Sequence, residues 1–79
     1  MDRDNVMRRL NEIFCDVFDD DSIVLTDNTS SEDIEDWDSL EQANLIVDIE
    51  REFGIRFKMD EVNTLKNVGE MVDLIVARI

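Results

Sequence analysis

The stretch DWDSLE, residues 36–41, lies where a long acidic segment meets the start of an amphipathic one. Asp38 is a residue type favoured at helix N-caps, and the glutamate three residues later completes the pattern of a capping box. We therefore expect a helix over about 39–53, ended by Gly54. Ser39 would lie at the helix start, beside backbone N–H groups that have no partner and favour a phosphate-bearing group.

Apolar residues cover most of the circumference of this helix. So wide an apolar arc predicts a central helix with two or more neighbours. The arc is formed by Leu40, Ala43, Leu45, Ile46, Val47, Ile49 and Phe53. The rest of the helix is a narrow polar stripe that partners would contact. The stripe is formed by Glu41, Asn44, Asp48, Arg51 and Glu52.

Periodic apolar residues predict the remaining helices. A first helix is expected over about 3–18, with the apolar face Val6, Leu10, Ile13, Phe14 and Val17. A brief helix is expected over about 60–65. A last helix follows Asn67, which forms a second cap pair with Glu70, and its apolar face is Val68, Met71, Val72, Ile75 and Ile79. The expected fold class is all-α, a small four-helix bundle with three main helices and one short helix.

The segment 19–37 is expected to be a long loop between the first two helices. Nine acidic residues and no basic residue occur between positions 19 and 38. A loop of this length is usually functional or disordered, and its apolar residues argue against disorder. The expected anchors are Ile23, Val24, Leu25, Ile34 and Trp37. We expect a single domain over 1–79.

Composition excludes several function classes. The net charge of −13, from 21 acidic and 8 basic residues, opposes binding to nucleic acids and anionic membranes and attracts basic partners. Histidine is absent and Cys15 is the single cysteine, which excludes histidine-based catalytic triads, multi-cysteine zinc sites and internal disulfides. The acids lack the spacing of a calcium loop. With no signal-peptide or transmembrane pattern, we expect a cytoplasmic monomer without a metal site.

The sequence resembles the acyl carrier proteins. In that family the second helix begins with Asp-Ser-Leu, which corresponds to residues 38–40 here, and ends with Glu-x-Phe-Gly, to whose last three positions Glu52-Phe53-Gly54 corresponds. The similarity continues through Asp60-Glu61 and Val68-Gly69-Glu70, so it covers essentially the whole chain. Some positions depart from the family. Asp36 replaces a frequent glycine and Trp37 follows it, Asn44 and Arg51 replace frequent acids, and Lys58 replaces a common proline. The Trp-Asp-Ser-Leu variant at residues 37–40 resembles specialised stand-alone carriers more than the housekeeping fatty-acid carrier, so the departures bear on the set of partners and not on the attachment site.

The resemblance implies that Ser39 is the attachment site of 4′-phosphopantetheine. A phosphopantetheinyl transferase would install this arm from coenzyme A with Mg²⁺, through a phosphodiester bond. The arm would carry acyl intermediates as thioesters between acyl-loading and acyl-transfer enzymes of a fatty-acid, polyketide or other specialised pathway. Asp38 would flank the site and cap the helix, and no residue would be catalytic. The expected partner-contact residues are Leu40, Glu41, Asp48 and Glu52.

Other interpretations stay open at this point. The chain could be an aminoacyl or peptidyl carrier that uses the same arm, or an acidic interaction module with no prosthetic group. In an interaction module of this kind, Ser39 would be an ordinary helix-start residue. A further set of residues is expected in the core, and in a carrier that encloses its cargo these residues could part to admit an acyl chain. This set is Leu45, Ile49, Phe57, Leu65 and Met71.

Overall fold

A computed structural model describes residues 2–34 and 37–79, and within them four helices and no strand are present. These are α1 (Arg3–Phe18), α2 (Ser39–Phe53), α3 (Met59–Asn63) and α4 (Val68–Val76). The all-α four-helix class is therefore confirmed, and the bounds of α1 and α2 match expectation. The last two helices end earlier than expected, since α3 ends before Leu65 and α4 ends before Ile79.

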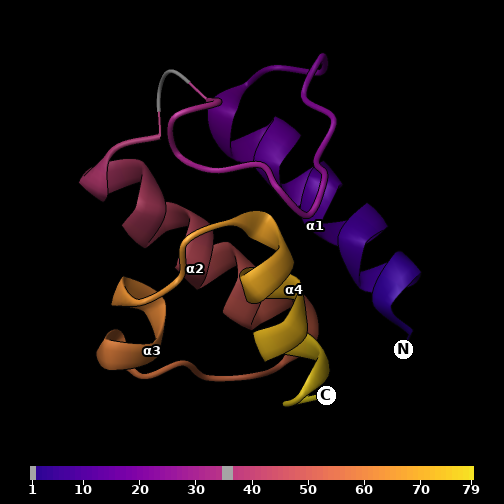
Figure 1. Cartoon of the computed structure of the whole chain (residues 1–79), viewed down its shortest axis with the longest axis vertical. Helices are drawn as coiled ribbons and strands as arrows, with labels where there is room; N and C mark the ends of the chain where they lie inside the picture. The colour runs from indigo at the N-terminus through magenta and orange to yellow at the C-terminus, as the bar shows by residue number, and fades with distance from the viewer. Residues whose placement is uncertain (1, 35–36) are drawn as a thin grey trace.

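The helix α1 packs along both α2 and α4, whereas the long loop and α3 lie at opposite ends of the molecule (Figure 1). The expectation that α2 is the central helix was wrong, since α1 is the element shared by the two main helix–helix contacts. Four side chains of α1 are buried: Val6, Leu10, Ile13 and Phe14. The predicted fifth member of this face, Val17, is only partly buried.

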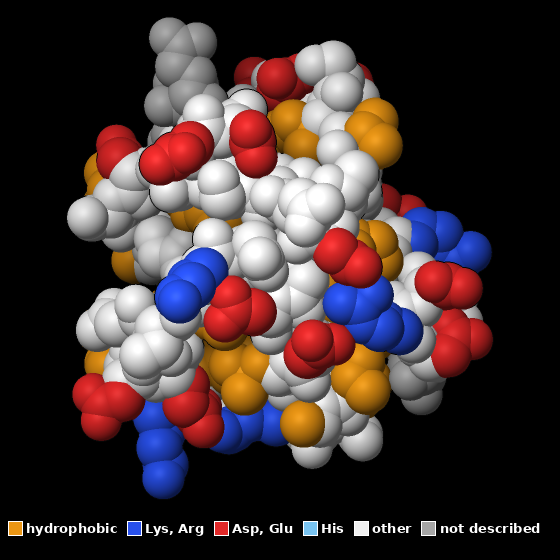
Figure 2. Space-filling model, in the orientation of Figure 1, with side chains coloured by type: hydrophobic (Ala, Val, Ile, Leu, Met, Phe, Trp, Pro, Cys, Tyr) orange, Lys and Arg blue, Asp and Glu red, His pale blue; other side chains and the backbone are white. Residues whose placement is uncertain are grey.

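The apolar arc of α2 is buried on one side only. Leu45 and Ile49 are fully buried, but Leu40 is 69% exposed and Val47 is 47% exposed. Ala43 is exposed as well. The helix therefore presents apolar side chains to solvent, and Figure 2 shows apolar side chains exposed between the acidic ones on one face of the molecule. Periodicity reports which residues share a helix face, but not how many neighbours cover it.

The remaining core residues come from α4 and from the connecting segments. Of the five candidates in the predicted set, Leu45, Ile49 and Met71 are buried, and Phe57 and Leu65 are partly buried against them. Of the expected loop anchors, Leu25 is buried and the side chains of Ile23, Ile34 and Trp37 are partly buried. Val24 was wrongly predicted as an anchor, because it is 80% exposed. The N–H of Leu25 donates to the side-chain oxygen of Asn11 on α1 at 2.7 Å, which holds Leu25 against the core, whereas the adjacent Val24 faces solvent.

The long loop is fastened to the start of α4 by backbone hydrogen bonds. The N–H of Val68 donates to the carbonyl oxygen of Thr29 at 2.8 Å, and the N–H of Gly69 donates to that of Asp27 at 3.0 Å. Arg3 forms ion pairs with Asp27 at 2.9 Å and with Asp73 at 3.0 Å. The loop is thus tied to both α1 and α4.

Within the part of the chain that the structure describes, each helix is too short or too polar to cross a membrane.

Candidate functional site

Asp38 is the N-cap of α2. Its backbone is extended, with φ −107°, and one carboxylate oxygen accepts a hydrogen bond from the N–H of Glu41 at 2.9 Å. Its carbonyl oxygen accepts the first helical hydrogen bond, from the N–H of Gln42 at 2.9 Å. The predicted cap is therefore present. The reciprocal half of the capping box, from the Asp38 N–H to the Glu41 carboxylate, is not formed among the described residues.

Ser39 is the first helical residue, and its side chain is exposed. Because Asp38 supplies the cap, the hydroxyl of Ser39 is not used for capping, and it has no hydrogen-bond partner among residues 2–34 and 37–79. The N–H groups of Ser39 and Leu40 likewise have no acceptor within those ranges. The start of α2 therefore combines a free hydroxyl with free backbone donors at the positive end of the helix dipole. This combination fits a phosphate ester on Ser39.

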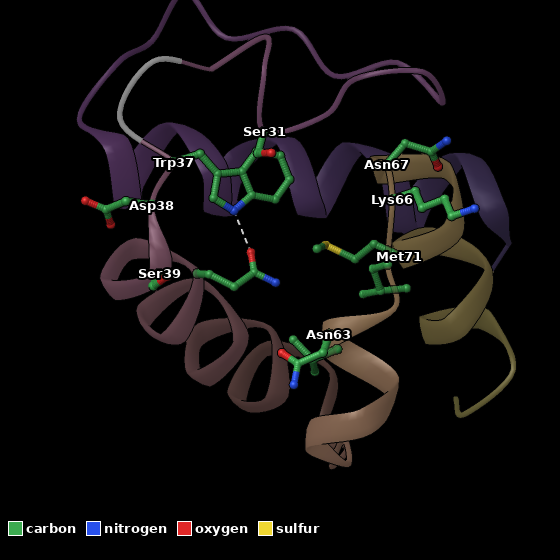
Figure 3. Close-up of a pocket in the computed structure, with 11 residues that line it drawn as sticks. Ser31, Trp37, Asp38, Ser39, Asn63, Lys66, Asn67 and Met71 are labelled. Carbon is green, nitrogen blue, oxygen red and sulfur yellow. Dashed lines mark hydrogen bonds between the residues drawn. The ribbon is translucent and has the colours of Figure 1, made fainter.

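A groove of about 330 Å³ opens beside Ser39. In Figure 3, Ser39 and Trp37 lie on one side of the groove and Lys66, Asn67 and Met71 lie on the other. The second wall comes from α3, from the segment before α4 and from α4 itself. The groove is thus formed by segments far apart in the sequence, which meet at the N-terminal end of α2.

Trp37 closes the groove toward α1. Its ring packs edge-on against Phe14, with the ring centroids 5.1 Å apart and an interplanar angle of 86°. It also lies against Phe18 at 6.3 Å. The indole N–H donates to the side-chain oxygen of Gln42. The anchoring role predicted for Trp37 is therefore observed, and the hydrogen bond to Gln42 is an additional contact that sequence reasoning missed.

The spacing of Gln42 from Ser39 is the one sequence signal that relates Gln42 to the site. Residues three apart lie on the same helix face, so Gln42 and Ser39 are neighbours on α2. Both line the groove. A polar side chain one turn after a candidate attachment residue is a weak signal by itself, because the same spacing occurs in every helix.

The structure separates the expected partner-contact residues into two groups. Leu40 and Glu41 adjoin Ser39 in the first turn of α2, where Leu40 is exposed and Glu41 is partly buried. Asp48 and Glu52 lie in the last two turns, about 14–20 Å along the helix from Ser39 at 1.5 Å per residue. Glu52 forms an ion pair with Arg9 of α1. Only the first group is therefore part of the immediate surroundings of Ser39.

Cys15 lies away from the groove on α1 and is partly buried. Burial raises the pKa of its thiol, and the nearby carboxylates of Asp21, Asp20 and Asp16 raise it further. The thiol contacts the carbonyl oxygen of Ile23 at 3.7 Å. A raised pKa lowers the fraction of thiolate, which is the nucleophilic form of cysteine. This environment agrees with the predicted packing role.

The many acids do not form a metal site in the described ranges. No group of three or more acidic or cysteine side chains there is close enough together to hold an ion. Hydrogen bonds from the hydroxyl and the backbone N–H of Ser22 lower the pKa of Asp20, so the loop uses this carboxylate as a local hydrogen-bond acceptor.

Comparison with known proteins identifies the family. Residues 8–75 match the family described as "Phosphopantetheine attachment site". The acyl carrier protein of Lactobacillus acidophilus is 29% identical over 75 residues, which cover 95% of this chain and 94% of that protein. The acyl carrier protein of Rubrobacter xylanophilus is 34% identical over 77 residues, which cover 96% and 94%.

A solved structure agrees with these sequence matches. The solution structure of a holo acyl carrier protein from Geobacter metallireducens superimposes with a TM-score of 0.88 and 49% sequence identity. The match covers 92% of this chain and 84% of that one. The chain therefore belongs to the acyl carrier protein family, whose members are carriers with a covalently attached phosphopantetheine and not enzymes.

Proposed function

We propose that Ser39 is the residue that carries 4′-phosphopantetheine, and that the protein shuttles acyl groups on this arm between enzymes of a fatty-acid, polyketide or other specialised acyl pathway. The observation that carries the proposal is the exposed hydroxyl of Ser39 at the first position of α2, which has no hydrogen-bond partner in the part of the chain that the structure describes. Asp38 performs the capping that would otherwise explain a polar residue there. Membership of the family supplies the cofactor class.

The residues around Ser39 would hold the phosphodiester without any rearrangement of the helix. The free N–H groups of the first turn and the helix dipole favour the phosphate charge. Asp38 fixes the turn that presents the hydroxyl to solvent. When attached, the arm supplies a terminal thiol on which an acyl group is held as a thioester.

Among residues 2–34 and 37–79, no side chain is hydrogen-bonded to the hydroxyl of Ser39 and placed to activate it. The sequence has no histidine, and the carboxylate of Asp38 is engaged with the N–H of Glu41. This supports a phosphopantetheinyl transferase as the source of the attachment chemistry, which would bind the start of α2 and deprotonate the hydroxyl.

We propose that partner enzymes meet this carrier through a basic surface around a small apolar contact. Leu40 is exposed directly beside Ser39, and Glu41 lies in the same helical turn. The net charge of −13 attracts basic partners over a distance, which speeds encounter more than it strengthens binding. Glu52 would contribute less than the sequence suggested, because a partner must compete with Arg9 for it.

Intact-protein mass spectrometry tests the attachment site. The wild type, Ser39→Ala and Ser31→Ala would be incubated with coenzyme A, Mg²⁺ and a broad-specificity phosphopantetheinyl transferase. Ser31 is a matched control, because it is a second serine that lines the groove. We expect one added phosphopantetheine on the wild type and on Ser31→Ala, and none on Ser39→Ala. Modification of a folded Ser39→Ala variant would contradict the proposal.

The class of cargo needs a separate assay. An aminoacyl or peptidyl carrier would be loaded by amino-acid adenylating enzymes, whereas an acyl carrier would be loaded by acyltransferases or acyl ligases. We expect loading of the holo protein by the second group only.

A further inference from the structure

The side-chain amide of Gln42 is oriented by Trp37. An indole N–H can only donate a hydrogen bond, so the Gln42 atom that faces it must be the oxygen. The NH₂ group of Gln42 is then left as a donor, and it has no acceptor among residues 2–34 and 37–79. Trp37 itself is held by its edge-on contact with Phe14. The orientation of the amide is therefore fixed by packing.

This donor lies in the groove that begins at Ser39. Gln42 lines the same groove, one helical turn after Ser39. The facing wall includes the apolar side chains of Val62, Leu65 and Met71, and Figure 3 shows the thioether of Met71 pointing into the groove. One wall thus offers an oriented donor, and the other combines the apolar side chain of Leu65 with the polar side chains of Asn63, Lys66 and Asn67.

We propose that the NH₂ group of Gln42 binds an amide carbonyl oxygen of the phosphopantetheine arm and so lays the first part of the arm along this groove. The proposal rests on the attachment at Ser39 proposed above. Beyond the branched, hydroxyl-bearing unit next to the phosphate, a pantetheine arm has two amide groups, each followed by a short methylene segment. The amide carbonyl matches the donor of Gln42, and the methylenes match the partly exposed side chain of Leu65. Trp37 is then a positioning residue, because it acts through Gln42.

Nuclear magnetic resonance can observe this contact directly, because side-chain NH₂ groups give their own signals in ¹⁵N-correlated spectra. Apo and holo forms of the ¹⁵N-labelled protein would be compared. We expect the NH₂ signals of Gln42 and the indole signal of Trp37 to shift on attachment of the arm. Asn44 is the internal control, because its exposed amide lies two residues away on a different face of α2. Its signals should not move.

A matched pair of variants separates the donor from the rest of the side chain. Gln42→Glu keeps an acceptor for Trp37 and removes the NH₂ donor, and Asn44→Asp makes the same chemical change outside the groove. Loss of one hydrogen bond should lower the docked fraction of the arm about fivefold. In Gln42→Glu the signals of the arm should move toward those of free pantetheine, whereas in Asn44→Asp they should stay as in the wild type.

Mass spectrometry of the same samples distinguishes the two proposals. Absence of an adduct would count against the attachment at Ser39. An adduct on Ser39 with unchanged Gln42 and Trp37 signals would overturn the groove contact alone. Signals that move only after an acyl group is loaded would also overturn it, because the acceptor would then belong to the cargo. The wild-type comparison keeps the test valid even if Gln42→Glu does not fold.

Discussion

Substitution of Gly69 by alanine should destabilise the fold although it replaces a poor helix former by the best one. Gly69 is the second residue of α4, and its N–H donates to the carbonyl oxygen of Asp27 at 3.0 Å. A Cβ atom at position 69 would stand 2.9 Å from that oxygen and 3.1 Å from the Cβ of Asp27. Because the nearest atom belongs to the backbone, the loop must move away from α4. The neighbouring hydrogen bond from Val68 to Thr29 would be stretched as well.

The size of the effect follows from two opposing contributions. Forcing a methyl group into a packed site costs about 1–3 kcal/mol. The higher helix propensity of alanine returns at most about 1 kcal/mol. The net loss in the free energy of unfolding should be about 1–2 kcal/mol. For a domain of this size each kcal/mol lowers Tm by about 4–8 °C, so we expect a fall in Tm of roughly 5–15 °C.

Urea and thermal unfolding followed by circular dichroism would measure this loss, with Gly54 as the matched comparison. Gly54 has φ +65°, and an added Cβ would have no atom within 4 Å. Its substitution should therefore depend on backbone conformation only, so that Gly54→Asn costs less than Gly54→Ala. At position 69 asparagine should be no better than alanine. An unchanged or higher Tm for Gly69→Ala would refute the steric argument and leave helix propensity as the dominant effect.

Three further outcomes are expected. Asp38→Ala should lower the free energy of unfolding in urea by about 1 kcal/mol. Asp38→Asn should lose much less, because asparagine also caps helices. Equal losses in the two variants would show that the charge of Asp38 matters more than its cap. Cys15 should be alkylated by iodoacetamide more slowly than free cysteine at pH 8, because its raised pKa lowers the fraction of thiolate. The reaction should become faster as the pH rises above 9. Fast labelling at pH 8, measured by mass spectrometry, would contradict the buried environment. Thermal melts should show Tm rising with added NaCl, because the net charge of −13 is screened; a constant Tm would mean that charge repulsion is unimportant.

Local signals determined the parts of the fold that the sequence predicted well. The cap at Asp38 and the left-handed Gly54 define the two ends of α2, and both act within a few residues of the helix. The same holds for the start of α4, where the side chain of Asn67 accepts the N–H of Glu70 at 2.9 Å. Hydrogen bonds of this kind are encoded in adjacent residues, so they can be read without knowledge of the tertiary structure.

Burial on α2 could not be predicted in the same way. Leu40 and Val47 are as apolar as Leu45 and Ile49, but only the second pair is covered by neighbouring elements. The difference depends on where the other helices pass, which is a property of the whole fold. Under the proposed function, Leu40 beside the candidate attachment site would belong to the contact surface for partners.

The residues of the groove beside Ser39 show why only part of the site could be predicted from the sequence. Ser39 is placed by Asp38, a neighbour in the chain, whereas Trp37 is placed by Phe14, more than twenty positions away. Gln42 acquires a defined orientation only because Trp37 is fixed in this way. The position of the hydroxyl is therefore a local property of the start of α2, and the orientation of the donor beside it is a tertiary one.

The far wall of the groove depends on the end of the chain. The helix α3 spans only Met59–Asn63, too short to be stable by itself. Arg78 forms an ion pair with Glu61, donates to the carbonyl oxygen of Arg56 at 2.7 Å and lies 5.9 Å from the ring centre of Phe57. These contacts tie the chain after α4 to both sides of the α3 start. Because α3 contributes Val62 to the groove, the shape of the groove is coupled to Arg78, whereas the exposure of Ser39 is not. Under the two proposals above, attachment and positioning of the arm would therefore be separable: the first would depend on the start of α2, and the second on contacts between distant segments of the fold.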